Sequence, residues 1–235
     1  MQTLRGKRES QAGLSMAELL VVMVIVTIIS TMLVASWISL QRSFAFAQAK
    51  NTAQATARDA LARMSSELRA AQPPTDSSIT PFYLLLAPPY VCGETSCVFY
   101  SAYNNSAAAD GTGRAQLRLT AIWLDPSGTK AQKTLKWTRD TNKSGLLGDT
   151  VGGIADTTRI LAENVVNTAF VNKPIFTYWR PDATVVWVSS TKLTSSTVEK
   201  IRAVRIELLV DADLSHNPSY VDLTTTVRPR NAGTF

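Results

Sequence analysis

Residues 8–43 of this chain read RESQAGLSMAELLVVMVIVTIISTMLVASWISLQRS. From position 19 to position 40 every residue is apolar, Ser or Thr. Because a helix rises about 1.5 Å per residue, this apolar run has the roughly 20 residues that cross the core of a bilayer. Three basic residues precede it, namely Arg5, Lys7 and Arg8. Basic residues at this position favour a cytoplasmic N-terminus and an exported remainder.

One carboxylate, Glu18, directly precedes the apolar run. The run has three interpretations, and they differ in whether they account for this residue. A cleaved secretory signal peptide has an apolar core of about 7–15 residues, and this run is longer. An ordinary single-pass anchor fits the length but leaves Glu18 unexplained. A carboxylate costs about 2.5–3.5 kcal/mol at the centre of a spanning helix and less near its end. A third interpretation also accounts for Glu18.

The stretch GLSMAELLVVMVIVTIIS, residues 13–30, resembles the N-terminal signature of type IV pilins and of the pilin-like proteins of type II secretion. In that family a membrane-embedded prepilin peptidase removes a short basic leader after Gly, and the new N-terminus is usually methylated. The resemblance implies a leader that ends at Gly13 and an N-methylated mature N-terminus at Leu14. Glu18 is then the fifth mature residue, where the family carries Glu. Leu14 departs from the commoner Phe or Met.

The resemblance implies an assembly role for Glu18. Cleavage creates an amino group near the membrane, and in a filament this amine meets the Glu18 carboxylate of a neighbouring subunit. Such a pair attracts strongly in low dielectric, and an unpaired charge is costly there. The implied partners are the prepilin peptidase, other major and minor pilins or pseudopilins, the inner-membrane assembly platform and membrane lipid. The implied location is the inner membrane, single-pass, and then a pilus or pseudopilus at the cell surface or in the periplasm.

The helical pattern continues beyond the apolar run. Apolar residues recur at three- and four-residue steps, and no Gly or Pro occurs between Leu14 and Gln72. Pro73 and Pro74 then end the helix, because proline lacks the amide donor. The sequence therefore predicts a transmembrane or filament-core helix over residues 14–40 and its amphipathic continuation over residues 41–72.

Residues 73–235, here called the head, change to a period of two and are rich in β-branched and aromatic residues. Asp125-Pro-Ser-Gly is a turn signal that joins RLTAIWL to KTLKWTR as a hairpin. Residues 140–157 are expected to form an exposed loop. Strands are predicted over residues 79–86, 98–103, 115–125, 132–139, 165–171, 175–180, 184–188, 198–210 and 220–227. The predicted class is α+β, with the long helix on an antiparallel sheet in a pilin-like fold. In the head, the stretches RILAENVVNTAFVN, IRAVRIELLVDAD and VDLTTTVRPRN occur in the order found in minor subunits of the PilW and GspJ type, which the head therefore resembles.

Two cysteines, Cys92 and Cys97, lie in the stretch VCGETSC. In an exported head the leading interpretation is a disulfide that closes this short loop and stabilises by about 2 kcal/mol. Free thiols are the alternative. A metal site would need more ligands than these cysteines and the single histidine, His216, so no metal is expected.

The chain has a net charge of +6, which weakly favours anionic partners. A basic stretch surrounds Trp137 and contains Lys130, Lys133, Lys136 and Arg139. Its two interpretations are a solvated basic face and a nucleic-acid patch on a DNA-uptake pilus. No G-x-S-x-G elbow or phosphate-binding loop is present, so we expect neither enzymatic activity nor a cofactor. The expected function is that of a minor prepilin or pseudopilin that primes filament assembly.

Overall fold

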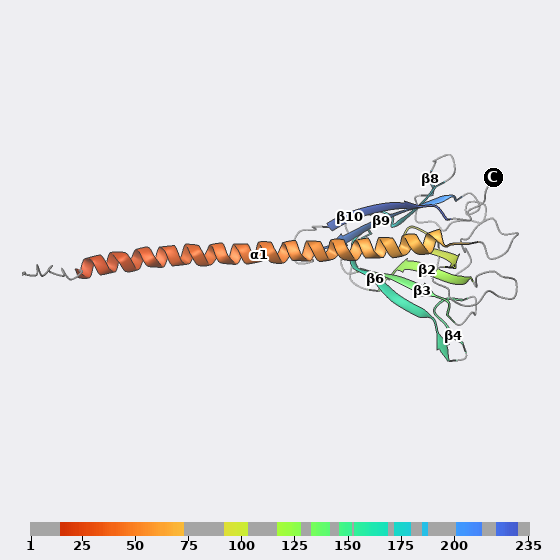
Figure 1. Cartoon of the computed structure of the whole chain (residues 1–235), viewed down its shortest axis with the longest axis horizontal. Coiled ribbons are helices and arrows are strands. Elements are labelled where there is room, and N and C mark those ends of the chain that lie inside the picture. The colour runs from red at the N-terminus through yellow and green to blue at the C-terminus, as the bar shows by residue number, and fades with distance from the viewer. Residues whose placement is uncertain are drawn as a thin grey trace, which may run out of the picture. The chain divides into compact units, whose positions relative to one another are not determined.

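The structure is a computed structural model. It describes residues 15–72, 92–102, 117–127, 133–141, 146–151, 153–168, 172–179, 185–187, 201–212 and 220–229. The chain divides into two compact units, residues 1–47 and residues 48–235. Figure 1 follows the chain from red at its N-terminus to blue at its C-terminus.

One long helix, α1 (Met16–Arg69), contributes residues to both units. Its sequence contains no Gly or Pro, so no position inside it loses a backbone donor. Within the second unit, the buried side chains of α1 recur at three- and four-residue steps and include Ala53, Ala57, Ala60, Leu61, Met64 and Leu68. They form the face that packs on the sheet. Three of them are alanines, and the larger Leu61, Met64 and Leu68 lie in the same core cluster as the strand residues.

α1 ends at Arg69, earlier than the predicted end at Gln72. The Gln72 amide instead donates a hydrogen bond to the carbonyl of Tyr100 at 2.9 Å, and the residue before it forms an antiparallel bridge with Ser101. A residue before proline avoids helical dihedrals, so the chain becomes extended ahead of Pro73. The end of the helix is thereby tied to the first strand of the sheet.

The described strands all pair antiparallel. The eight strands of the main sheet are β1 (Ser96–Ser101), β2 (Arg118–Leu124), β3 (Lys133–Arg139), β6 (Thr157–Val165), β7 (Phe176–Trp179), β8 (Val185–Trp187), β9 (Ala203–Asp211) and β10 (Tyr220–Val227). Their order is β1-β2-β3-β6-β9-β7-β8, and β10 pairs with β9 outside this path. The short strands β4 (Thr150–Val151) and β5 (Ile154–Ala155) form a separate pair. The long apolar N-terminal helix and the antiparallel sheet agree with the predicted α+β class.

The position of β6 corrects the sequence prediction. A strand was expected over residues 165–171, whereas the strand occupies Thr157–Val165 and pairs with β3. Inside the exposed loop expected over residues 140–157, β4 and β5 form a short antiparallel pair. Three consecutive side chains of β6, at positions 158–160, are exposed. The alternation of buried and exposed residues that marks a strand is therefore absent over much of its length. The predicted strand over residues 79–86 lies outside the described residues.

Asn167 explains why β6 does not continue past Val165. β6 and β7 lie along the same edge of β9, one after the other. The buried Asn167 side chain donates a hydrogen bond to the Glu207 carbonyl at 2.7 Å and accepts one from the Leu209 amide at 2.9 Å. Between β6 and β7, the Asn167 side chain thus forms the hydrogen bonds with the β9 backbone that a neighbouring strand would otherwise form.

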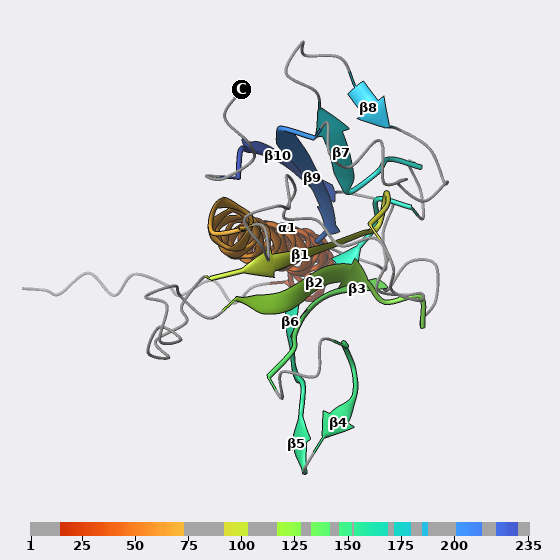
Figure 2. The same ribbon diagram turned by 90° about the vertical axis from the view of Figure 1, so that its right-hand side faces the viewer.

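A buried carboxylate holds α1 against the sheet. Glu67 projects from the helix into the core, and its side chain is fully buried. Both of its oxygens accept hydrogen bonds from the Arg139 guanidinium on β3, at 3.0 and 2.8 Å. The Ser101 hydroxyl on β1 donates to one of them at 3.0 Å, and Arg63 lies 3.3 Å from the other. Figure 2 views this part of α1 end-on, with β1 and β2 on one side and β9 and β10 on the other.

Trp137 completes this cluster. The Arg139 guanidinium lies 4.9 Å from the centre of the Trp137 ring, and the Arg63 guanidinium lies 5.3 Å from it. An aromatic ring attracts cations over its face, so the ring adds to the attraction of Glu67 for both arginines. Burial raises the pKa of Glu67 above its ordinary value, and the positive charge of Arg139 opposes this shift. Burial also lowers the pKa of Arg139, opposed by Glu67.

Glu67→Ala is expected to destabilise the second unit by about 3–5 kcal/mol, because it leaves the buried Arg139 without its carboxylate. Denaturant unfolding of the full chain in detergent, followed by tryptophan fluorescence, measures this loss. The matched control is Glu163→Ala on β6, where the side chain is exposed and the expected change is within about 0.5 kcal/mol.

The double variant Glu67→Leu with Arg139→Met separates charge from packing. Because both buried charges are removed together, it should recover most of the stability that Glu67→Ala loses. A double variant as unstable as Glu67→Ala would show that the ion pair is not the cause.

Candidate functional site at the start of helix α1

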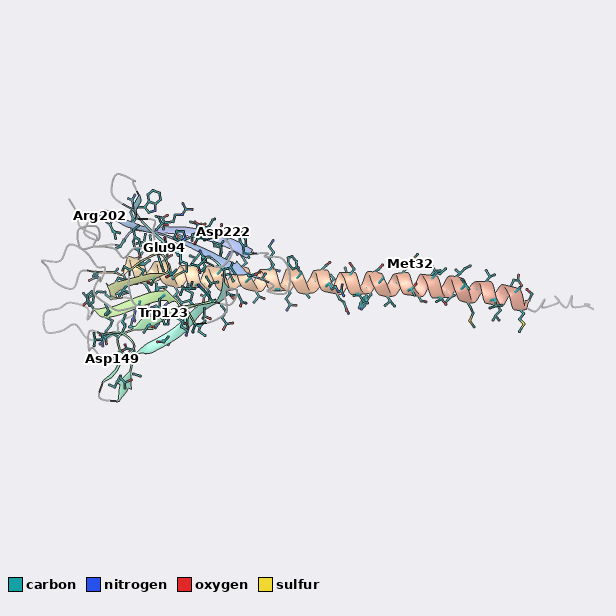
Figure 3. All side chains as sticks on the ribbon, turned by 180° about the vertical axis from the view of Figure 1, so that it is seen from behind. Met32, Glu94, Trp123, Asp149, Arg202 and Asp222 are labelled. Carbon is teal, nitrogen blue, oxygen red and sulfur yellow. The ribbon has the colours of Figure 1, made fainter. Side chains whose placement is uncertain are left out.

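The amino-terminal half of α1 presents an apolar surface on all sides. Every residue over positions 15–48 is exposed, whereas buried residues of the helix begin at Ala53. Met32, halfway along this segment, is 65% exposed, and Figure 3 shows it projecting outward with its neighbours. By length and composition, α1 can cross a membrane. A surface of this size and apolarity needs a cover of lipid or of other apolar side chains.

The two threonine hydroxyls within this surface are already hydrogen-bonded. Thr27 donates to the Met23 carbonyl at 2.8 Å, and Thr31 donates to the Ile28 carbonyl at 2.8 Å. Such bonds to the preceding turn satisfy a polar group without a partner outside the helix. These threonines can therefore lie in an apolar environment at little cost.

Glu18 lies at the start of α1 and forms a capping box with Ser15. The Glu18 amide donates to the Ser15 hydroxyl at 3.2 Å, and one carboxylate oxygen of Glu18 accepts a hydrogen bond from the Ser15 amide at 3.1 Å. The first amides of a helix have no partner within the helix, and this reciprocal pair satisfies two of them. The negative charge also lies at the positive end of the helix dipole.

The capping role of Ser15 was missed from the sequence, although its signal was present. Residues 15–18 read SMAE, and Ser-x-x-Glu directly before an apolar run is the pattern of a capping box. Glu18 therefore has a hydrogen-bond partner, Ser15, inside its own chain. The predicted cleavage residue Gly13 and the predicted mature N-terminus Leu14 lie outside the described residues.

Cys92 and Cys97 are both fully buried thiols in this structure. The Cys92 sulfur accepts a hydrogen bond from the Val98 amide at 3.1 Å and donates one to the Val98 carbonyl at 3.2 Å. The predicted disulfide stays a prediction, and the two side chains it would join are neighbours. Within the described part of the chain, no three His, Cys, Asp or Glu side chains are grouped to hold a metal ion. His216 lies outside that part.

The described members of the basic stretch have partners within the chain. Lys133 donates a hydrogen bond to the Thr168 hydroxyl at 2.9 Å, and Arg139 holds the buried Glu67. Lys130 lies outside the described residues. A phosphate would have to compete with these intramolecular contacts, so the geometry favours a structural role over nucleic-acid binding for Lys133 and Arg139.

Lys136 is paired in the same way. Its ammonium group donates to the Asp125 carboxylate and lies 5.5 Å from the centre of the Trp123 ring, its cross-strand neighbour. Asp125 also accepts hydrogen bonds from the amide and the hydroxyl of Ser127, at 2.8 and 2.6 Å. Asp125 and Ser127 belong to the turn predicted after RLTAIWL, whose Gly128 lies outside the described residues, and β2 and β3 pair as the predicted hairpin.

Comparison of the chain with protein-family models, with curated proteins and with solved structures found no match. Its function has to be inferred from its own residues and their geometry.

The pairing of Asp125 predicts a specific pH dependence. The hydrogen bond from Lys136, followed by that from Ser127, lowers the pKa of Asp125 from 3.8 to about 2. This stabilisation is complete above the unfolded value of 3.8 and is lost as the pH falls through about 2. Asp125→Asn keeps the oxygen that caps the turn but loses the charge. The wild type should be more stable by about 1 kcal/mol at pH 6, a value reduced for solvent screening, and the two proteins should converge near pH 2.

Denaturant midpoints of the full chain in detergent at pH 6, 4 and 2.5 measure this difference. The control is Asp59→Asn on the exposed face of α1, which should show no such convergence. A difference between wild type and Asp125→Asn that does not change with pH would refute the ion-pair explanation.

Proposed function

We propose that this protein is a prepilin-like subunit that is cleaved after Gly13 and assembled through α1 into a type IV pilus or a type II secretion pseudopilus. The resemblance of residues 13–30 to the prepilin signature motivates the proposal. The structural observation that carries it is the amino-terminal half of α1, which is apolar, exposed on all sides and preceded by one carboxylate. As a minor subunit of the PilW or GspJ type, the protein would prime filament assembly.

The exposed apolar surface explains why two different environments would suit the same helix. In the membrane, lipid covers the side chains over residues 19–40. In a filament, the corresponding helices of neighbouring subunits cover them. Transfer from one to the other exchanges one apolar contact for another, and so it carries little hydrophobic cost. The head would stay packed on the carboxyl-terminal half of α1 during this transfer.

Glu18 would then exchange partners during assembly. In the precursor its carboxylate caps the helix through Ser15. Cleavage after Gly13 would place a charged amine at Leu14, and the carboxylate of a neighbouring subunit would neutralise that amine. An ionic hydrogen bond is roughly twice as strong as a neutral one, so the new pair can compete with the cap. The nucleic-acid alternative gains no support from Lys133, Lys136 and Arg139, which have intramolecular partners.

Cleavage is tested by the mass of the mature protein. In a host with an active prepilin peptidase, N-terminal mass spectrometry should find a chain that begins at a methylated Leu14. Gly13→Ala should leave the leader attached, because the peptidase of this family cuts after Gly. A wild-type chain that still begins at Met1 in that host would overturn the proposal in favour of an ordinary single-pass anchor.

A matched pair of variants distinguishes the two proposed partners of Glu18, which are Ser15 in its own chain and the amine of a neighbouring subunit. Glu18→Gln keeps a side chain that can complete a capping box but removes the charge, whereas Ser15→Ala removes the cap and keeps the charge. If the amine is the assembly partner, Glu18→Gln should abolish incorporation into filaments, and Ser15→Ala should retain it. Immunoblots of sheared filaments and of the membrane fraction report incorporation and precursor level. Equal incorporation of both variants would refute the pairing role.

A further inference from the structure

The segment from Cys92 to Cys97, here called the cysteine loop, joins two parts of the sheet that are far apart in strand order. β1 is the first strand of that order, and β7 is the last but one. The carbonyls of the loop accept hydrogen bonds from backbone amides on both sides. These are Ile175 to Glu94 at 2.8 Å, Phe176 to Glu94 at 3.0 Å, and Leu124 to Thr95 at 2.9 Å. The loop therefore links β2 to β7 by main-chain hydrogen bonds.

Tyr178 on β7 also binds the cysteine loop, through hydrogen bonds made inside the core. Its buried hydroxyl lies 3.2 Å from the Gly93 carbonyl and 3.1 Å from the Ser96 carbonyl, and both can accept its hydrogen. Figure 2 shows the yellow segment ahead of β1 reaching toward β7, and Glu94 is labelled in Figure 3. Because β1 and β7 are near opposite ends of the strand order, the cysteine loop acts as a clasp that closes the curved sheet over its core.

The two sulfur atoms lie at the two ends of this clasp and are enclosed by it. Cys92 and Cys97 have no exposed surface. Burial raises the pKa of the Cys97 thiol well above its ordinary value. Thiol–disulfide exchange requires that a thiolate reach a sulfur atom of the disulfide that it attacks. In the closed head neither sulfur can be reached from solvent, so an oxidant or a reductant acts on the pair only after the head has opened locally.

We infer that Cys92 and Cys97 are oxidised to a disulfide before the sheet closes, by exchange with an external disulfide donor, and that the bond then locks the clasp. One cysteine thiolate attacks the donor disulfide and forms a mixed disulfide. The second attacks the cysteine sulfur of that intermediate, which releases the donor as a dithiol. The donor gains two electrons and the two thiol hydrogens. The inference rests on the proposed export of the head, where disulfide donors act.

The first test uses the full-length protein purified in detergent from an oxidising host. Denaturation in the presence of a maleimide, without reductant, should label neither cysteine, and the mass should be two hydrogens below that of the reduced chain. Dithiothreitol should reduce the native protein at least about 100-fold more slowly than the denatured one, since reduction needs local opening. After reduction, the midpoint of thermal unfolding should fall by about 4–8 °C.

Labelling of both cysteines in exported protein would overturn the inference, and so would equal reduction rates in the native and denatured states. Export itself is checked separately, by protease access to the head in spheroplasts. A head that stays inside would refute the proposed function, whereas an exported head with free thiols would refute only the disulfide.

The second test weakens the clasp without changing a cysteine. Tyr178→Phe keeps the ring but removes the hydroxyl that faces two carbonyls of the loop, and reduction of its native disulfide should become roughly tenfold faster. Tyr220→Phe on β10, which is 39% exposed, should leave the rate unchanged. Near-UV circular dichroism confirms that both variants are folded. If Tyr178→Phe is reduced no faster than Tyr220→Phe, the clasp does not control access to the bond.

Discussion

The buried pair of Glu67 and Arg139 is the constraint on which the packing of the second unit depends. A helix held only by apolar contacts can slide or rotate at small cost, whereas a carboxylate inside the core must meet its cation. Arg139 comes from β3 and the hydroxyl of Ser101 from β1, so two strands define where Glu67 lies. A shift of α1 by one turn, about 5.4 Å, would leave both charges buried and unpaired. The pair therefore specifies the register of helix and sheet.

The sheet shows how an irregular strand path can still close over one core. β9 pairs with β10 along one edge and with β7 and then β6 along the other. Asn167 supplies hydrogen bonds where β6 has ended. The cysteine loop supplies them between β2 and β7, which are not neighbours. In both places a few polar groups satisfy backbone atoms that a regular ladder would have paired, as a buried backbone requires.

The two halves of α1 have opposite requirements, and the sequence meets each of them. The carboxyl-terminal half buries alanines and a paired acid against strands of its own chain. The amino-terminal half exposes apolar side chains over residues 19–40, and the hydroxyls of Thr27 and Thr31 are bonded to its own backbone. No residue that the structure describes covers it. In the proposed function that cover is first lipid and then neighbouring helices, and Glu18 changes from a capping residue to an intermolecular partner.

The sequence by itself determined the features that depend on local patterns. The apolar run, the long helix without Gly or Pro, the turn at Asp125 and the alternating strand at residues 220–227 could all be predicted from residues close together in the chain. Ser15 could have been predicted as well, because Ser-x-x-Glu is a local signal. Only the tertiary structure decided the path of β6, the partners of Lys136 and Arg139, and the enclosure of Cys92 and Cys97. These depend on contacts between residues far apart in sequence, where burial and pairing override local preference.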